Sequence, residues 1–232
     1  MNLFYQPRIP EGILHLDTDE SRHCIKVLRK GKGDTIRITD GCGSFYEAII
    51  TDDNPAACAF IIERKIVEAP RSYSIHLAIS PTKNADRIEW FVEKAVELGI
   101  DTISLVLCKH TERAYLKTER LEKVALSAMK QSLKATLPKI AAATNFQTIV
   151  EKSSEPFRFI AFVDHANPDH LKDIAKPGSD YLVLIGPEGD FSAEELQLAQ
   201  VHGFQKVSLG ESRLRTETAG LAACLILNLI NS

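Results

Sequence analysis

The pattern of hydrophobic and polar positions changes near Ala69-Pro70-Arg71. Three short apolar runs with strand-like alternation precede this point, at residues 35–39, 44–51 and 57–67. Glycine- and aspartate-rich turn signals separate the runs at close spacing, which is typical of hairpins and predicts a small antiparallel barrel. A single helix, predicted from Asp19 to Arg29, interrupts the barrel. We therefore divide the chain into two domains, residues 1–69 and 70–232.

In the second domain, apolar runs alternate with helical patterns. The predicted strands are 73–80, 102–107 and 159–164, and the predicted helices are 84–98 and 118–135. Such alternation predicts an α/β domain with a parallel sheet covered on both faces. Residues 140–154 fit a strand and a helix equally well.

Two strand-loop-helix units end the chain. The first runs from Leu182-Val183-Leu184-Ile185 through Gly186-Pro187-Glu188-Gly189-Asp190-Phe191 into a helix. Ser192 and Glu195 have the spacing of a capping box at the start of this helix, and Gly203 is placed to end it. The second unit runs from Val207-Ser208-Leu209-Gly210 to an apolar helix predicted over 219–230. Both loops would follow the carboxyl ends of parallel strands, where open α/β sheets bind ligands.

These two loops resemble the SPOUT-class ribosomal RNA methyltransferases, and among them the small subunit methyltransferase E family, which methylates N3 of a uridine in 16S rRNA. The shared pattern is Gly-Pro-Glu-Gly followed by Leu-Gly-x-x-x-Leu-Arg-x-Glu-Thr-Ala, here beginning at Gly186 and at Leu209. The chain departs from it at Asp190, where the family usually has Gly, and at Ser212 and Arg213, where Arg and Ile are expected. A Gly-x-x-Gly turn alone is also common as a plain strand-to-helix turn. The resemblance implies a SPOUT-type parallel-sheet domain with a trefoil knot, preceded by a PUA-like β-barrel domain.

Composition agrees with a globular protein, with 44% hydrophobic and 25% charged residues. The net charge of −3 gives no overall sign of nucleic-acid binding, so RNA contacts would come from local patches. Five scattered cysteines without a Cys-x-x-Cys pair are typical of reduced thiols in a cytoplasmic protein. We expect no signal peptide, because no basic region followed by a long apolar run stands at the amino terminus. We also expect no membrane association, because the longest apolar stretch, 219–230, is too short to span a bilayer.

The family's cofactor is S-adenosylmethionine. By resemblance, the residues that would hold it lie in the two loops and are Ile185, Gly186, Gly189, Leu209, Gly210 and Leu214. Glycine suits such loops because backbone amides must approach the cofactor closely. We expect no metal, since the sequence offers no cluster of metal ligands, and the lack of a nucleophile with a paired base speaks against a hydrolase.

Methylation at uridine N3 requires removal of the N3 proton. A carboxylate can accept this proton, and a guanidinium can stabilise the negative charge that spreads to the base carbonyls. The candidates are Glu217 and Arg215, with Glu188 as the second carboxylate. In the alternative reading, Glu217 only favours the amino end of the last helix, for which Thr216 or Thr218 would be the cap.

Basic residues form two candidate RNA-binding groups. In the first domain, Arg22, Lys26 and Arg29 fall at i, i+4 and i+7 of the predicted helix, within a run that resembles the family's PUA-like domain. In the second domain, the group comprises Lys83, Arg87, Arg113 and Lys134. The competing interpretation of each is a solvated surface, because charge runs usually mark only solvent.

The expected partners are 16S rRNA, within an assembled or assembling small subunit, and a second copy of the chain. The homodimer rests mainly on the resemblance, in which the knotted region forms the subunit interface. Two alternatives stay open: a non-catalytic RNA-binding protein that keeps the fold, and a ribose 2′-O RNA methyltransferase of the same class.

Overall fold

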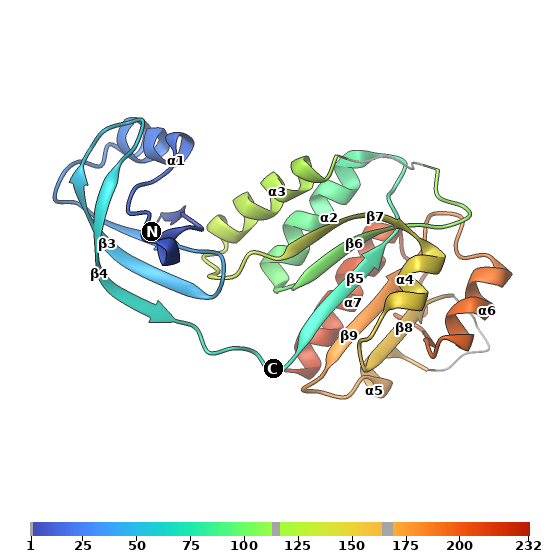
Figure 1. The fold of residues 1–232 in the computed structure, drawn as a ribbon. Helices are drawn as coiled ribbons and strands as arrows, with labels where there is room; N and C mark the ends of the chain where they lie inside the picture. Colours follow the sequence, from blue (N-terminus) through green and yellow to red (C-terminus); the bar gives the residue numbers. More distant parts are fainter. Residues whose placement is uncertain (1, 113–116, 164–168) are drawn as a thin grey trace. The chain divides into compact units, whose positions relative to one another are not determined.

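The computed structural model describes residues 2–112, 117–163 and 169–232 (Figure 1). The chain forms two compact units. The first contains residues 1–70 and 126–137, and the second contains 71–125 and 138–232. The second half of helix α3 (Thr118–Gln131) and the turn after it therefore belong to the first unit, although they follow residue 70 in sequence.

The first unit contains a four-stranded sheet in the order β1-β2-β3-β4. Its strands are β1 (Leu3–Tyr5), β2 (Thr35–Thr39), β3 (Ser44–Asp52) and β4 (Ala59–Val67). The sheet is mixed: β2, β3 and β4 pair antiparallel as predicted, whereas β1, which the sequence pattern did not predict, pairs with β2 in parallel. The long connection from Tyr5 to Thr35 permits the parallel pairing, which a hairpin cannot make. Phe4, Leu16, Ile38 and Phe60 are fully buried in the core of this unit.

The helical segment of the first unit is not one regular helix. After the 3-10 turn Ile9–Glu11, helix α1 spans only Thr18–Arg22, and its cap Asp17 accepts a hydrogen bond from the Glu20 amide. A π-helical turn, η2 (His23–Val27), follows. It places Cys24 in the core, and Arg29 lies past its end with a positive φ of 54°. The predicted helix from Asp19 to Arg29 is therefore helical only as far as Val27, and its second half is a π-helical turn.

The second unit contains a six-stranded parallel sheet in the order β10-β8-β9-β5-β6-β7, as the alternating pattern predicted. The strands are β5 (Ser74–Ile79), β6 (Thr102–Leu107), β7 (Lys139–Asn145), β8 (Phe157–Ala161), β9 (Asp180–Ile185) and β10 (Gln205–Val207). The ambiguous segment 140–154 supplies both β7 and helix α4 (Phe146–Lys152), and Asn145 caps the helix by accepting a hydrogen bond from the Thr148 amide.

Helices cover both faces of this sheet (Figure 1). Helices α2 (Ala85–Leu98) and α7 (Thr216–Ile230) pack together on one face, with α5 (Leu171–Ile174) against α7. Helices α4 and α6 (Ala193–Val201) cover the other face. The predicted capping box of α6 is confirmed: the Ser192 hydroxyl accepts from the Glu195 amide, and the Glu195 carboxylate accepts from the Ser192 amide. Helix α7 starts at Thr216, earlier than predicted.

Candidate active site

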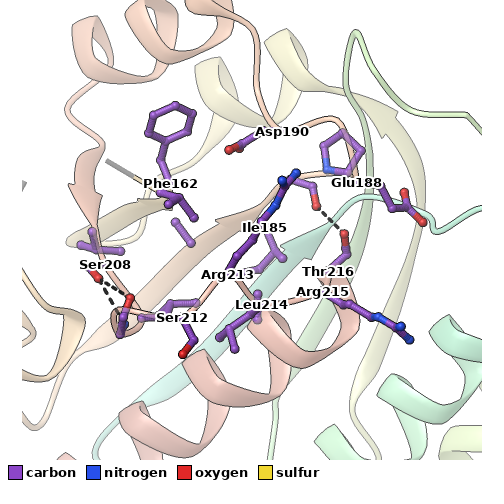
Figure 2. A pocket seen from close by; sticks show the side chains of 18 of the residues that line it. Phe162, Ile185, Glu188, Asp190, Ser208, Ser212, Arg213, Leu214, Arg215 and Thr216 are labelled. Atoms are coloured by element: carbon purple, nitrogen blue, oxygen red, sulfur yellow. Dashed lines mark hydrogen bonds between the residues drawn. The ribbon is translucent and has the colours of Figure 1, made fainter. Parts of the chain in front are cut away.

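A cavity of about 1040 Å³ lies at the carboxyl ends of three neighbouring strands of the second unit. Ala161 ends β8, Ile185 ends β9 and Val207 ends β10, and all three residues line the cavity. The loops that leave β9 and β10 form most of its wall (Figure 2). The cavity therefore lies where the carboxyl-end rule places ligands in an open parallel sheet.

Hydrogen bonds fix the two loops. The Thr216 hydroxyl at the start of α7 donates to the carbonyl of Gly186 at 3.0 Å, which joins the second loop to the first (Figure 2). The Ser208 side chain bonds both the amide and the carbonyl of Gly210, each at 3.1 Å. On the outer side, His110 Nδ1 lies 3.1 Å from the carbonyl oxygen of Gly189 and 3.0 Å from that of Asp190. The pocket is thus preformed by the chain itself.

The glycines of these loops are required by the fold. A Cβ atom on Gly186 would lie 3.0 Å from the Phe191 ring. Gly210 has a φ of +125°, which residues with a side chain rarely adopt. Glycine is therefore required here for two reasons: room for the cofactor, as the sequence suggested, and steric and backbone constraints within the protein itself.

The structure brings five of the six predicted cofactor-binding residues together. Ile185, Gly186, Leu209, Gly210 and Leu214 line the cavity. Gly189 is not among the lining residues, and its backbone packs against His110, whose Cβ would lie 3.0 Å from an added Cβ.

The candidate catalytic residues separate into two groups. Glu188 and Arg215 line the cavity, whereas Glu217 does not. The carboxylate of Glu217 is buried: its Oε1 lies 3.8 Å from Nε of Arg87, and its Oε2 has no hydrogen-bond partner among the described residues. Because α7 begins at Thr216, the cap position belongs to Arg215, so the assignment of Thr216 or Thr218 as the cap is wrong.

The predicted RNA-binding residues fall in both units. Arg22, Lys26 and Arg29 are exposed on the first unit, which also contains the half-buried Lys134. In the second unit, Arg87 lines the cavity, and the exposed ammonium of Lys83 lies 3.0 Å from Glu112. Arg113 lies outside the described residues.

Sequence reasoning missed several lining residues, including Phe162, Asp190 and Arg213. Phe162 follows β8 directly, so the carboxyl-end rule could have found it. Asp190 and Arg213 were noted only as departures from the family pattern. Burial raises the pKa of Asp190, which is opposed by a hydrogen bond from the Phe191 amide and by the charges of Arg213 and His110. The pocket therefore holds a carboxyl group that sequence spacing did not assign.

The chain is similar to known RNA methyltransferases. Residues 69–228 match the RNA methyltransferase domain model, and residues 16–63 match the RNA methyltransferase PUA domain model. A ribosomal RNA small subunit methyltransferase E from Synechocystis is 30% identical, over 95% of this chain and 74% of its own length. The chain belongs to this RNA methyltransferase family. A relative of the same name from Aquifex aeolicus is 27% identical, over 98% of this chain and 99% of its own.

Solved structures agree with the family. A probable rRNA-methyltransferase from Porphyromonas gingivalis has a TM-score of 0.93 at 44% identity, covering 100% of this chain and 98% of that one. The small subunit methyltransferase E of Neisseria gonorrhoeae, bound to S-adenosyl methionine, has a TM-score of 0.86 at 28% identity, with the same coverage. The predicted family, the α/β fold with a PUA-like domain and the methyltransferase class are confirmed.

Within 2–112, 117–163 and 169–232, no helix combines the length and apolar character needed to cross a membrane. In the same ranges, no group of three or more His, Cys, Asp or Glu side chains could hold a metal ion.

Proposed function

We propose that this protein transfers a methyl group from S-adenosylmethionine to N3 of a uridine in 16S rRNA of the small ribosomal subunit. The observation that carries the proposal is the preformed pocket at the ends of β8, β9 and β10, built from the two glycine loops that match the family. A protein that only bound RNA would not need such a pocket.

The pocket residues fit the cofactor. Its volume of about 1040 Å³ is in the range of pockets for small molecules, and apolar side chains of Ile185, Leu209 and Leu214 can contact an adenine ring. Gly210 leaves backbone groups open to a ligand, since a Cβ added there would meet no atom within 4 Å. When bound, S-adenosylmethionine supplies a methyl group on a sulfonium, so no metal is needed.

Different residues in and beside the pocket accept the uridine proton, stabilise the developing charge and position a cation. Glu188 lines the cavity, and its Oε1 accepts a hydrogen bond from the Lys83 amide at 3.2 Å, which orients the carboxylate. We assign Glu188 as the acceptor of the N3 proton. The guanidinium of Arg215 stabilises the negative charge on the base carbonyls as the proton leaves. The buried Glu217 acts through Arg87, holding this cation at the cavity.

The first domain, residues 1–69, holds the RNA. Arg22, Lys26 and Arg29 are exposed cations that can contact phosphates. Lys83 and Lys134 are further candidates for phosphate contact, while Arg113, which lies outside the described residues, is proposed from sequence alone. Phosphate contacts of this kind position the substrate without reading its sequence.

We also propose that the protein acts in the cytoplasm as a homodimer. Two large apolar side chains of α7 are solvent-exposed in the single chain, Leu225 at 44% and Leu229 at 61%. A second copy that covered them would bury apolar surface, which favours association.

The test is methyl transfer to small subunits from cells that lack the protein, followed by mass spectrometry of the nucleosides. We expect 3-methyluridine in 16S rRNA. Glu188→Gln should lower turnover by about a hundredfold or more while cofactor and RNA binding stay near normal. Formation of a ribose-methylated nucleoside, or no product at all, would contradict the proposal.

Two further variants separate positioning from chemistry. If Glu217→Gln, and not Glu188→Gln, carries the large loss of turnover, Glu217 is the proton acceptor and our assignment is wrong. Replacing Arg22, Lys26 and Arg29 together with alanine should weaken RNA binding and reduce its salt dependence by about 0.7 to 0.9 log units per lost contact, with turnover at saturating RNA little changed. An unchanged salt slope would show that these cations are only a solvated surface.

A further inference from the structure

All three departures from the family pattern, Asp190, Ser212 and Arg213, lie at the pocket, and two of them, Asp190 and Arg213, are charged. Both residues line the cavity. Asp190 belongs to the loop that leaves β9, and Arg213 belongs to the loop that leads into α7, so the two side chains come from different walls (Figure 2). Sequence gave no reason for an acidic and a basic residue at these positions.

The carboxylate of Asp190 is held in place. Its backbone has a positive φ of 62°, a conformation that Asp and Asn tolerate better than other residues with side chains. Oδ1 accepts a hydrogen bond from the Phe191 amide at 2.9 Å, and His110 Nδ1 lies 3.0 Å from the Asp190 carbonyl oxygen. The first contact orients the carboxylate, and the second holds the backbone of Asp190 at the pocket wall.

The charges of Asp190 and Arg213 interact, but the two side chains form no ion pair. The positive charge of Arg213 lowers the pKa of Asp190, which burial alone would raise further. Among the described residues, however, no ion pair joins the two side chains, although several other pairs in this chain do form. The pocket thus presents an anion and a cation that are near enough to interact and are not neutralised by direct contact.

Other charged groups at the pocket already have roles. Glu188 accepts a hydrogen bond from the Lys83 amide, and Arg87 lies beside Glu217. Glu211 and Arg213 both line the cavity with exposed side chains, but of these two only Arg213 is a charge that acts on Asp190. Asp190, which is half-buried, and Arg213 are the pair best placed to meet a ligand that carries both signs of charge.

A free α-amino acid group is such a ligand, because its ammonium and carboxylate sit on one carbon. We propose that Asp190 and Arg213 clamp the amino-acid end of S-adenosylmethionine, with Asp190 accepting hydrogen bonds from the ammonium and Arg213 donating to the carboxylate. Guanidinium and carboxylate groups form charge-assisted hydrogen bonds of this type, which are about twice as strong as neutral ones. This inference rests on the proposed binding of S-adenosylmethionine in the same pocket.

Calorimetric titration with three nucleosides tests the clamp: S-adenosylmethionine, S-adenosylhomocysteine, and 5′-methylthioadenosine, which lacks the amino-acid end. Asp190→Asn keeps the side-chain shape and the tolerance for positive φ but removes the charge. We expect this variant to bind the first two ligands about tenfold or more weakly than the parent protein does. Its affinity for methylthioadenosine should stay within about twofold of the parent value. Arg213→Gln should show the same selectivity. The matched control is Glu122→Gln, which removes an exposed carboxylate on α3 that does not line the pocket and should change no affinity.

The outcomes are distinct. Equal weakening of all three ligands by Asp190→Asn would mean that the residue only shapes the pocket, and loss for S-adenosylmethionine alone would mean that it senses the sulfonium; either result overturns the clamp. Unchanged affinity in both variants overturns it as well. If the unmodified protein binds none of the three nucleosides, the proposed function itself fails, whereas binding without selectivity in the variants removes only the clamp.

Discussion

A hydrogen bond from His76 on β5 lowers the pKa of Glu155, and this effect outweighs the opposing effect of burial. His76 Nδ1 lies 2.7 Å from Glu155 Oε1, and Nε2 lies 2.7 Å from the Ser104 hydroxyl on β6. The three side chains link two central strands to the loop before β8. They lie in the second unit and line no part of the cofactor pocket.

This chain of contacts predicts a pH-dependent stability. The pKa of Glu155 is lower in the folded than in the unfolded protein, so the ionised carboxylate stabilises the fold. This stabilisation is fully present above the unfolded pKa near 4.5 and is lost as the pH falls through the folded pKa. Glu155→Gln should therefore lower the free energy of unfolding by about 1 kcal/mol at pH 7. Urea denaturation at several pH values should show this difference shrinking below pH 4.5.

The control for this prediction is Glu63→Gln, which removes an exposed carboxylate on β4. It should leave the unfolding free energy nearly unchanged at every pH. A Glu155→Gln difference that stays constant down to pH 3 would mean that packing, and not the charge, makes the contribution.

At the scale of elements, α2 and α7 pack closely because one residue has no side chain. Gly220 lies in the first half of α7, and a Cβ there would fall 2.6 Å from Cε2 of Phe91 and 3.1 Å from Cδ1 of Ile79. Phe91 is fully buried in α2, so it has little room to move. The amino end of α7, which carries the pocket residues, therefore depends on this contact for its position against the sheet.

Two opposing effects decide the outcome of Gly220→Ala. Alanine in place of glycine stabilises a helix interior by about 1 kcal/mol, while overpacking a core costs about 1 to 3 kcal/mol. An overlap at 2.6 Å with a buried ring favours the larger cost, so we expect a net loss of about 1 kcal/mol, measured by urea denaturation.

Gly31→Ala serves as the matched substitution, since its Cβ would meet only the Asp53 carboxylate at an ordinary 3.7 Å. It should leave stability almost unchanged. If Gly220→Ala turns out more stable than the parent, the two helices have room to separate and the close contact is not required.

At the scale of the whole molecule, the exposed apolar residues of α7 bear on assembly. The helix is buried on the side that faces α2 and the sheet, whereas Leu225 and Leu229 are exposed. An exposed apolar patch on a folded unit commonly marks a protein interface. Ala223, Cys224 and Leu227 of α7 are buried in the core of the unit, whereas Leu225 and Leu229 stay open to a partner.

We predict that the unmodified protein is a dimer, with twice the chain mass of 25.7 kDa by light scattering. Leu225→Asp together with Leu229→Asp should give a monomer, because charge on this surface cannot be buried against a second copy without a large cost. Val201→Asp, at a 76% exposed position on α6, is the control and should stay dimeric. A monomeric parent protein would contradict the dimer directly.

The sequence by itself determined most of the strand and helix order of the second unit and the location of the site. Alternation of apolar runs predicted the parallel sheet, Ser192 and Glu195 predicted the start of α6, and the carboxyl-end rule predicted a pocket at the two glycine loops. These features are local, since each depends on periodicity or on residues a few positions apart. The trefoil knot stays a prediction from the resemblance.

Only the tertiary structure decided which residues meet. Glu217 follows Arg215 by only two residues in sequence, yet its carboxylate is buried beside Arg87 and does not line the cavity. In the sequence, Asp190 and Arg213 were unrelated departures from the family pattern, and only the fold places both at one pocket. The need for glycine at position 220 likewise follows only from its contact with Phe91. The physical reason is that helix phase and loop path set the direction of a side chain, and both are fixed by packing between segments far apart in the chain.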